Sequence, residues 1–242
     1  MISFIHIGKT GGTTIHKMLQ GRVKHYKQYH MKKNYKTNEQ YIIWTRNPIS
    51  RFVSAFNHSY YGVHTDPHTI KHFNLNECLI PRWMKESKKK GFVFSKAYDT
   101  LVKSFSSANE LAESLTSEDK VKAKRAKSLM RRDEEHLFKG IGWHLNNGEF
   151  IEKNNNRIIF VGKIETMKED IEALGKKLNI ILDSDLKLRE NVYIDKSMKY
   201  LSPLAIQNII DWYKLTDYAA LEQLHNYGWI SKELLESYYK YE

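Results

Sequence analysis

The chain of 242 residues has a single cysteine, Cys78, which excludes an intramolecular disulfide and suits a reducing compartment. No apolar run approaches the roughly 18 residues of a membrane-spanning helix, so we expect no transmembrane segment. No signal-peptide pattern precedes the first apolar run, and we therefore expect a cytoplasmic location. The length suits one domain with a sizeable core, which we expect to comprise residues 1–242.

Acidic residues are scarcer than basic ones, 28 against 39, which gives a formal net charge of +11. Residues 21–38 contain six Lys or Arg, three Tyr and no acid. Such a stretch is typical of a solvated loop, of a rim that attracts an anionic acceptor, or of a surface that binds nucleic acid. We do not expect a nucleic-acid partner, and the first two interpretations stay open.

The first motif is GKTGGTT, from Gly8 to Thr14, directly after the apolar run Ile2–Ile7. The run predicts a strand buried on both faces, and Thr13 or Thr14 is expected to cap the helix that follows. Glycines that let an oxyanion approach, the N–H groups of a helix N-terminus and the charge of Lys9 predict an anion site. The register differs from a Walker A loop, which places its glycines before the lysine.

A second motif, RNPISRFVSAF, follows the apolar run 41–45 and begins at Arg46. Pro48 suits the first turn of a helix. Arg46 comes where the strand is expected to end, and Arg51 and Ser54 lie near one helical face. Because guanidinium groups bind phosphate oxygens in pairs, the motif predicts a site for a phosphate monoester.

Together and in this order, the two motifs resemble those of sulfotransferases that use 3′-phosphoadenosine 5′-phosphosulfate (PAPS). A third segment, Ile158–Lys163 followed by Ile164 and Glu165, is similar to a later segment of that family. The resemblance implies that the first loop binds the 5′-phosphosulfate, that the second motif binds the 3′-phosphate, and that no metal is needed. The donor-binding residues that it implies are Gly8, Lys9, Thr10, Gly11, Gly12, Thr13, Thr14, Arg46 and Ser54.

Sulfuryl transfer to a hydroxyl needs a base of near-neutral pKa and a positive charge at the leaving oxygen. By resemblance, Lys9 supplies that charge. Family members with a histidine base place it shortly before the strand that ends in the arginine motif, where His30 lies. His25 is the second choice and His16 a weaker one, whereas His6 is expected in the core or at a sheet edge. A carboxylate base, or an uninvolved surface histidine at position 30, remains an alternative.

The expected fold is α/β, a central, mostly parallel sheet flanked by helices as in the P-loop-like sulfotransferase fold. Ligand-binding motifs then lie at the carboxyl ends of strands. Residues 57–148 match the family only loosely, and we expect them to form a mainly helical acceptor-binding insertion. The expected later elements are helices over 95–115, 117–138 and 166–178, the last with a capping box from Thr166 to Glu169, and a helix that opens at Ser202.

The expected activity is transfer of the sulfuryl group from PAPS to an acceptor hydroxyl by in-line displacement, with adenosine 3′,5′-bisphosphate (PAP) as product. By resemblance to family members with a histidine in this position, the acceptor is expected to be a carbohydrate or glycan. A kinase-like phosphotransferase is one alternative, but only Glu165 could hold its magnesium at a strand end. A non-catalytic binder of nucleic acid or acidic glycan is another, and its binding would survive the loss of Lys9 and Arg46.

Overall fold

A computed structural model describes residues 1–30, 33, 35–62, 96–133, 136–185 and 196–241. These residues form two compact units, which we describe separately. The first comprises Met1–Arg51, Lys139–Tyr193 and Ile209–Glu242, and the second comprises Phe52–Phe138 and Ile194–Asn208. Cys78 lies outside the described residues.

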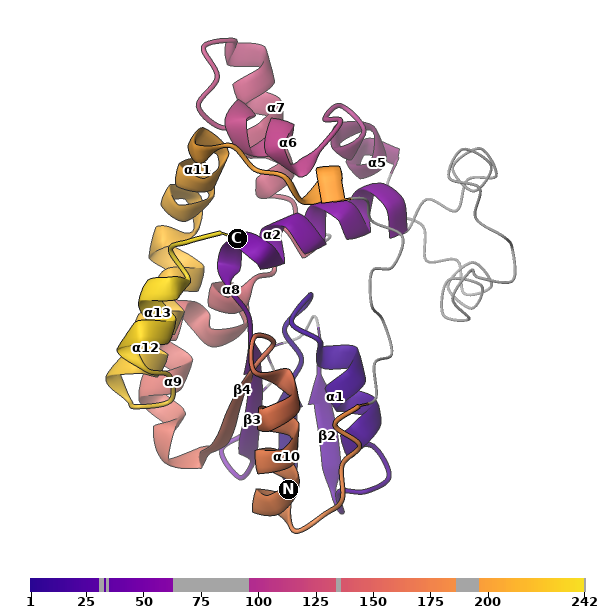
Figure 1. Cartoon of the computed structure of the whole chain (residues 1–242), viewed down its shortest axis with the longest axis vertical. Coiled ribbons are helices and arrows are strands. Elements are labelled where there is room, and N and C mark those ends of the chain that lie inside the picture. The colour runs from indigo at the N-terminus through magenta and orange to yellow at the C-terminus, as the bar shows by residue number, and fades with distance from the viewer. Residues whose placement is uncertain (31–32, 34, 63–95, 134–135, 186–195, 242) are drawn as a thin grey trace, which may run out of the picture. The chain divides into compact units, whose positions relative to one another are not determined.

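The first unit is built on a four-stranded, all-parallel sheet with the strand order β2-β1-β3-β4 (Figure 1). Two strands lie in the predicted apolar runs: β1 (Ile2–Ile5), which ends two residues before its run does, and β3 (Gln40–Thr45). A third strand, β4 (Ile158–Lys163), coincides with the third segment. Each is parallel to its neighbour, as strands joined by helical crossovers must be. The predicted α/β fold class is therefore confirmed.

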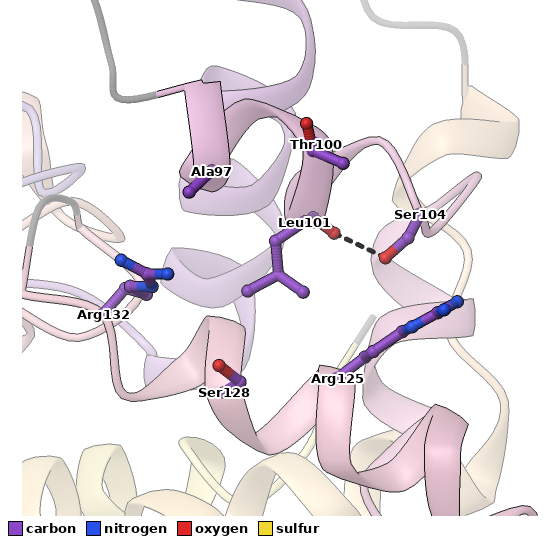
Figure 2. A pocket seen from close by; sticks show the side chains of 7 residues that line it. All are labelled: Ala97, Thr100, Leu101, Ser104, Arg125, Ser128 and Arg132. Carbon is purple, nitrogen blue, oxygen red and sulfur yellow. Dashed lines mark hydrogen bonds between the residues drawn. The ribbon is translucent and has the colours of Figure 1, made fainter.

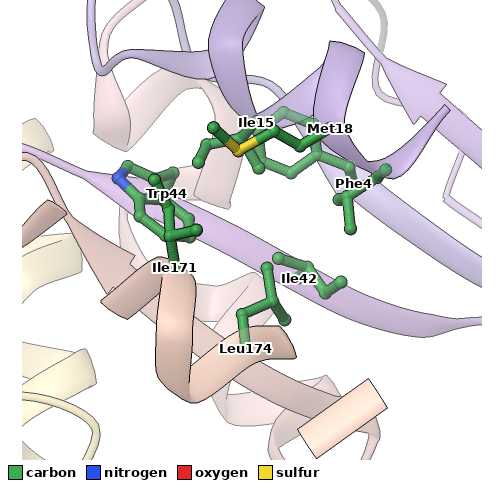
Figure 3. Close-up of a cluster of buried hydrophobic side chains, with 8 residues drawn as sticks. Phe4, Ile15, Met18, Ile42, Trp44, Ile171 and Leu174 are labelled. Carbon is green, nitrogen blue, oxygen red and sulfur yellow. The ribbon is translucent and has the colours of Figure 1, made fainter. Parts of the chain in front are cut away.

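Side chains of β1 and β3 that point to one face of the sheet form a hydrophobic core with two helices (Figure 3). These helices are α1 (Gly12–Leu19) and α10 (Met167–Leu178). The fully or almost fully buried members of this core are Phe4, Ile15, Met18, Leu19, Ile42, Trp44, Ile171 and Leu174. Burial of this many large side chains fixes both helices against the sheet and thereby fixes the loop that precedes α1.

The opposite face of the sheet is covered by a second group of helices in the first unit. Tyr41 of β3 points to this face, because side chains alternate along a strand, and its ring lies 5.0 Å from that of Phe150. The elements of this group, all in the first unit, are α8 (Ile141–Leu145), η3 (Asn146–Gly148), α9 (Glu149–Asn154), η4 (Asn155–Arg157), η6 (Lys214–Tyr218), α12 (Ala219–Asn226) and α13 (Lys232–Ser237).

Strand β2 (Tyr26–Tyr29) lies inside the basic stretch, so a solvated loop is the wrong interpretation for these four residues. The strand pairs in parallel with β1 at the end of the sheet order. The sequence YKQY lacks the continuous apolar run that marks a central strand. An edge strand does not need one, because it pairs on one side only and is less buried. The strand matters for function because it ends immediately before His30.

Every element that the structure describes between 57 and 148 is helical. In the second unit these include η1 (His58–Gly62), α5 (Lys96–Val102), α6 (Ala108–Ser114) and α7 (Lys120–Met130), with η5 (Lys196–Lys199) from later in the chain. Two helices contribute residues to both units: α2 (Pro48–Asn57) and α11 (Pro203–Tyr213), the latter opening after Ser202 as predicted.

Three predicted helix features are wrong. The helix expected over 95–115 is two helices, because the hydroxyl of Ser107 accepts the Glu110 N–H and starts a new helix there. The helix expected over 117–138 ends at Met130. Thr166 forms no capping box, since its hydroxyl donates to the Asp170 carboxylate at 2.8 Å instead.

Candidate active site

The carboxyl ends of three neighbouring strands meet at one edge of the sheet. Ile5 at the end of β1 is paired with Tyr29 of β2 and with Ile43 of β3. The residues that follow these strands therefore leave the sheet together: His6 to Gly8, His30, and Arg46. Ligands bind at this edge in open parallel sheets, so the two motifs and the candidate base converge where a ligand site is expected.

The loop between β1 and α1 has a left-handed backbone at Lys9 (φ 68°) and Gly11 (φ 77°). Gly11, and not Thr13 or Thr14, is the N-cap of α1, so the predicted threonine cap is wrong. The helix begins two or three residues earlier than expected because glycine adopts the left-handed conformation without steric cost. The Thr14 N–H bonds the Gly11 carbonyl at 3.0 Å. The N–H groups before it in the first turn have no partner within the helix and can bind an anion.

The threonines of the loop differ in burial and in hydrogen bonding. The buried hydroxyl of Thr10 donates to the carbonyl of Ile7 at 2.9 Å, which closes the turn after β1. Thr14 is buried and Thr13 is half-buried in the first turn of α1. Thr10 therefore fixes the shape of the loop, whereas the N-terminal turn of α1 presents the groups that could contact an anion.

Gly12 has no room for a side chain, because a Cβ atom there would lie 2.0 Å from Cδ2 of His6. The same Cβ would crowd the whole His6 ring, which lies at the carboxyl end of β1. The glycine thus lets the helix N-terminus approach the sheet edge closely.

We expect Gly12→Ala to destabilise the protein by about 1–3 kcal/mol, the usual cost of overpacking, and to weaken anion binding at the loop. Thermal or urea unfolding measures the first effect. The same substitution is then made in a His6→Ala protein. There Gly12→Ala should lower the free energy of unfolding clearly less, because the clash is removed. An equal cost in both backgrounds would contradict the proposed contact.

Arg46 leaves β3 beside the loop, and its Nη1 group donates to the carbonyl of Lys9 at 3.2 Å. Its Nε atom is buried and has no hydrogen-bond partner among the described residues. Burial lowers the pKa of the guanidinium, and the nearby Glu165 opposes that shift. A buried guanidinium with an unused N–H group is suited to a further anionic oxygen.

The turn between Arg46 and α2 is fixed by its neighbours. The side-chain carbonyl of Asn47 accepts the N–H of Ile49 at 2.8 Å and caps the helix. The backbone N–H of Asn47 donates to the Glu165 carboxylate at 2.8 Å. The other carboxylate oxygen of Glu165 accepts the Tyr238 hydroxyl at 2.8 Å. Both oxygens of Glu165 are thus engaged in holding this turn, so the carboxylate is poorly suited to a magnesium ion.

Lys163, at the end of β4, pairs with Asp170 and not with Glu165. The Lys163 ammonium lies 3.3 Å from the carboxylate of Asp170 in α10, and the Lys163 N–H donates to the same carboxylate at 2.8 Å. This side chain therefore stabilises the junction of β4 and α10.

Arg51, from the same motif as Arg46, binds a carboxylate of the first unit. Arg51 is fully buried, and its Nε atom donates to Asp217 of η6 at 3.1 Å. The second Asp217 oxygen accepts the Gly142 N–H of α8 at 2.8 Å, so the pair holds α8 in place. Ser54 is buried in α2 and belongs to the second unit, and its donor-binding role remains a prediction from the motif.

His30 is the histidine that the structure places at the site edge. Its ring stacks on that of His6 with 4.2 Å between centroids, and its Nδ1 atom lies 3.0 Å from the His6 carbonyl. Because a carbonyl can only accept, the proton of neutral His30 belongs on Nδ1, and Nε2 carries the lone pair that can accept a proton. Desolvation by the surrounding protein lowers the pKa of His30, the bond to His6 opposes this, and the charge of Lys139 adds to it.

The other candidate histidines have different surroundings. His25 is exposed and immediately precedes β2, and its carbonyl bonds the N–H of Ile2 at the amino end of β1. It therefore lies at the edge of the sheet opposite to the loop. His16 of α1 is hydrogen-bonded to the Tyr26 hydroxyl at 2.9 Å. His6, expected in the core or at an edge, is buried and supports both Gly12 and His30.

The second unit has a hollow of about 630 Å³ between α5 and α7 (Figure 2). Figure 2 shows Leu101 at its centre, with Arg125 and Arg132 at its sides and Ser128 between them. The remaining lining residues are Ala97, Thr100 and Ser104. The hollow contains no residue of the two motifs and lies within the region expected to contact the acceptor.

The described part of the chain contains no cluster of three or more His, Cys, Asp or Glu side chains that could hold a metal ion. Within the same residues, no helix is long and apolar enough to cross a membrane.

A glycine-rich loop and an arginine at neighbouring strand ends of a parallel sheet form a site suited to an anion. The model of the sulfotransferase family matches residues 1–227 of this chain. The chain therefore belongs to the sulfotransferase family and is an enzyme that transfers sulfuryl groups. Comparisons with curated proteins and with solved structures gave no match.

Proposed function

We propose that this sulfotransferase transfers the sulfuryl group of PAPS to a carbohydrate hydroxyl. The observation that carries the proposal is the convergence of the Gly8–Thr14 loop, Arg46 and an oriented His30 at one edge of the sheet. The loop and Arg46 are suited to bind a donor with several anionic groups. His30 is suited to take the proton of the acceptor hydroxyl.

The residues present fit the donor. The N-terminal turn of α1 and Lys9 offer N–H groups and a charge for the 5′-phosphosulfate. The buried Nε atom of Arg46, without a partner among the described residues, is suited to the 3′-phosphate. Gly12 lets the N-terminus of α1 lie close to His6 at the sheet edge, because no side chain stands between them. Ser54 completes the 3′-phosphate site by resemblance.

PAPS, when bound, supplies a sulfuryl group whose S–O bond to the phosphate breaks as the acceptor oxygen bonds to sulfur. Nε2 of His30 takes the proton of the acceptor hydroxyl. The His6 carbonyl holds the Nδ1 proton and so keeps the ring in the tautomer that can act as base. Lys9 stabilises the negative charge that develops on the leaving phosphate oxygen as PAP forms.

A carbohydrate acceptor is supported by the position of the histidine base, before the strand that ends in the arginine motif. The helical region 57–148, with the hollow between α5 and α7, is our proposal for further acceptor contacts. We propose that the enzyme is soluble and cytoplasmic. A kinase-like activity is less well supported, since Glu165 is already bound to Asn47 and Tyr238.

Calorimetric titration with PAP, beside AMP and ATP–Mg, tests the donor site. We expect Arg46→Ala to weaken PAP binding about 10- to 100-fold, since a hydrogen bond to a charged group contributes roughly 1.5–3 kcal/mol. Arg22→Ala, which removes an exposed arginine that is bonded to the Met18 carbonyl, is the charge-matched control and should bind PAP normally. Preference for ATP–Mg, or unchanged PAP binding by Arg46→Ala, would contradict the proposal.

A further inference from the structure

A short segment after α13 contacts the turn between β3 and α2. This segment, residues 238–241, lies beyond the part of the chain that the family model matches, and it belongs to the first unit. The Tyr238 hydroxyl donates to a carboxylate oxygen of Glu165 at 2.8 Å. The Lys240 carbonyl accepts the side-chain N–H of Asn47 at 2.9 Å. The segment therefore contacts both residues that hold the turn in place.

The segment is itself fixed within the first unit. Tyr238 is only 1% exposed, and its carbonyl accepts the hydroxyl of Tyr218 at 2.8 Å. The rings of Tyr218 and Tyr239 stack with 4.5 Å between their centroids. Burial, followed by the charge of Glu165, raises the pKa of the Tyr238 hydroxyl, so this group keeps its proton. The hydroxyl is therefore a fixed donor to the Glu165 carboxylate.

The carboxylate of Glu165 is a potential competitor for Arg46, because its other oxygen bonds the backbone N–H of the next residue, Asn47, at 2.8 Å. Carboxylates and guanidinium groups pair readily, often through two parallel hydrogen bonds. In this structure both Glu165 oxygens are bonded elsewhere, one to Asn47 and the other to Tyr238. The buried Nε atom of Arg46 has no hydrogen-bond partner within the described residues. The two bonds to Glu165 thus leave this N–H group to another anion.

We propose that Tyr238 is a positioning residue of the donor site, which holds Glu165 so that Arg46 stays open to the 3′-phosphate. Without the tyrosine hydroxyl, the released carboxylate oxygen would pair with the guanidinium, and the 3′-phosphate would have to displace it. The Lys240 carbonyl supports the same arrangement, because it holds the Asn47 side chain that caps α2. This inference rests on the proposed function, in which Arg46 binds the 3′-phosphate.

The test is calorimetric titration of the full chain with PAP, in a double-mutant cycle of Tyr238→Phe and Arg46→Ala. Tyr238→Phe removes the hydroxyl and keeps the buried ring. We expect it to weaken PAP binding about 10-fold when Arg46 is present. In the Arg46→Ala protein the same change should weaken PAP binding less than about twofold, because no guanidinium remains for Glu165 to occupy. The KM for PAPS should rise in Tyr238→Phe while kcat stays within about threefold.

Two further variants separate this role from a general loss of stability. Tyr239→Phe removes a hydroxyl from the neighbouring, more exposed residue, whose partner is Glu222 at 3.3 Å, and should bind PAP normally. In the Tyr238→Phe protein, Glu165→Gln should return the PAP affinity to within about threefold of that of the unaltered protein, since a neutral amide competes poorly for a guanidinium. A merely structural role of Tyr238 would not be relieved by this second change.

Three outcomes would overturn the inference. One is unchanged PAP binding by Tyr238→Phe, and another is an equal loss with and without Arg46, which would show that the tyrosine does not act through the arginine. The third is a Tyr238→Phe protein whose PAP affinity Glu165→Gln does not restore. Absence of PAP binding by the unaltered enzyme, or PAP binding that Arg46→Ala leaves unchanged, would instead defeat the proposed function on which the inference rests.

Discussion

Lys9→Ala is expected to lower kcat about 10²- to 10³-fold, which is the usual cost of removing one group that stabilises developing charge. The lysine lies in the turn that joins β1 to α1, and its carbonyl accepts a hydrogen bond from Arg46. In the mechanism that we propose, its ammonium acts mainly on the leaving oxygen. The KM for PAPS should therefore rise much less than kcat falls. Steady-state kinetics with labelled PAPS measure both parameters.

Lys17→Ala is the matched control for this variant, because Lys17 is an exposed lysine of α1 that follows the loop. It removes the same charge from the same region and should leave kcat unchanged. A folded Lys9→Ala enzyme with nearly full kcat would show that another group stabilises the leaving oxygen.

His30→Asn is expected to lower kcat by about 10²- to 10⁴-fold, the range for loss of a general base. The unaltered enzyme should lose kcat/KM as the pH falls through the pKa of His30. Because desolvation and the charge of Lys139 disfavour the imidazolium, this acidic limb should be centred below the ordinary histidine pKa of about 6.5. The pH profile of the variant should lack that limb.

His25→Asn provides the comparison for His30→Asn, since it makes the same chemical change at the opposite edge of the sheet. Asparagine also tolerates the positive φ of 56° at this position. We expect normal kcat and an unchanged acidic limb. If His25→Asn and His30→Asn had the same effect, a specific base at position 30 would be contradicted.

The sequence was sufficient to predict the parallel sheet and the meeting of the two motifs. Each motif follows a short apolar run that could only be a buried strand, and parallel strands end at one edge. The Gly11 cap could also have been predicted, since a glycine pair before a helix is a common place for a residue with a left-handed backbone. The threonines were favoured because they are stronger side-chain caps in general.

Contacts between distant segments could not be predicted. Arg51 belongs to the motif that predicted a phosphate site, but it is bound to Asp217, 166 residues later in the chain. The edge strand β2 was missed because its apolar pattern is weak, and its pairing with β1 is what brings His30 against His6. The ammonium groups of Lys33 and Lys139 both lie against the ring of Trp143, and the Tyr35 hydroxyl connects the segment of Lys33 to α8. In each case a tertiary contact, with no local signal, decides the role of the residue.

The most direct test of the proposed activity is incubation of the purified chain with PAPS and a set of glycans, with PAP and sulfated product measured together. A PAPS-dependent sulfotransferase should release PAP and form sulfated sugar in equal amounts, and Lys9→Ala and His30→Asn should lower both in parallel. Failure to form sulfated sugar from any glycan, or sulfation that Lys9→Ala and His30→Asn leave intact, would contradict the assignment.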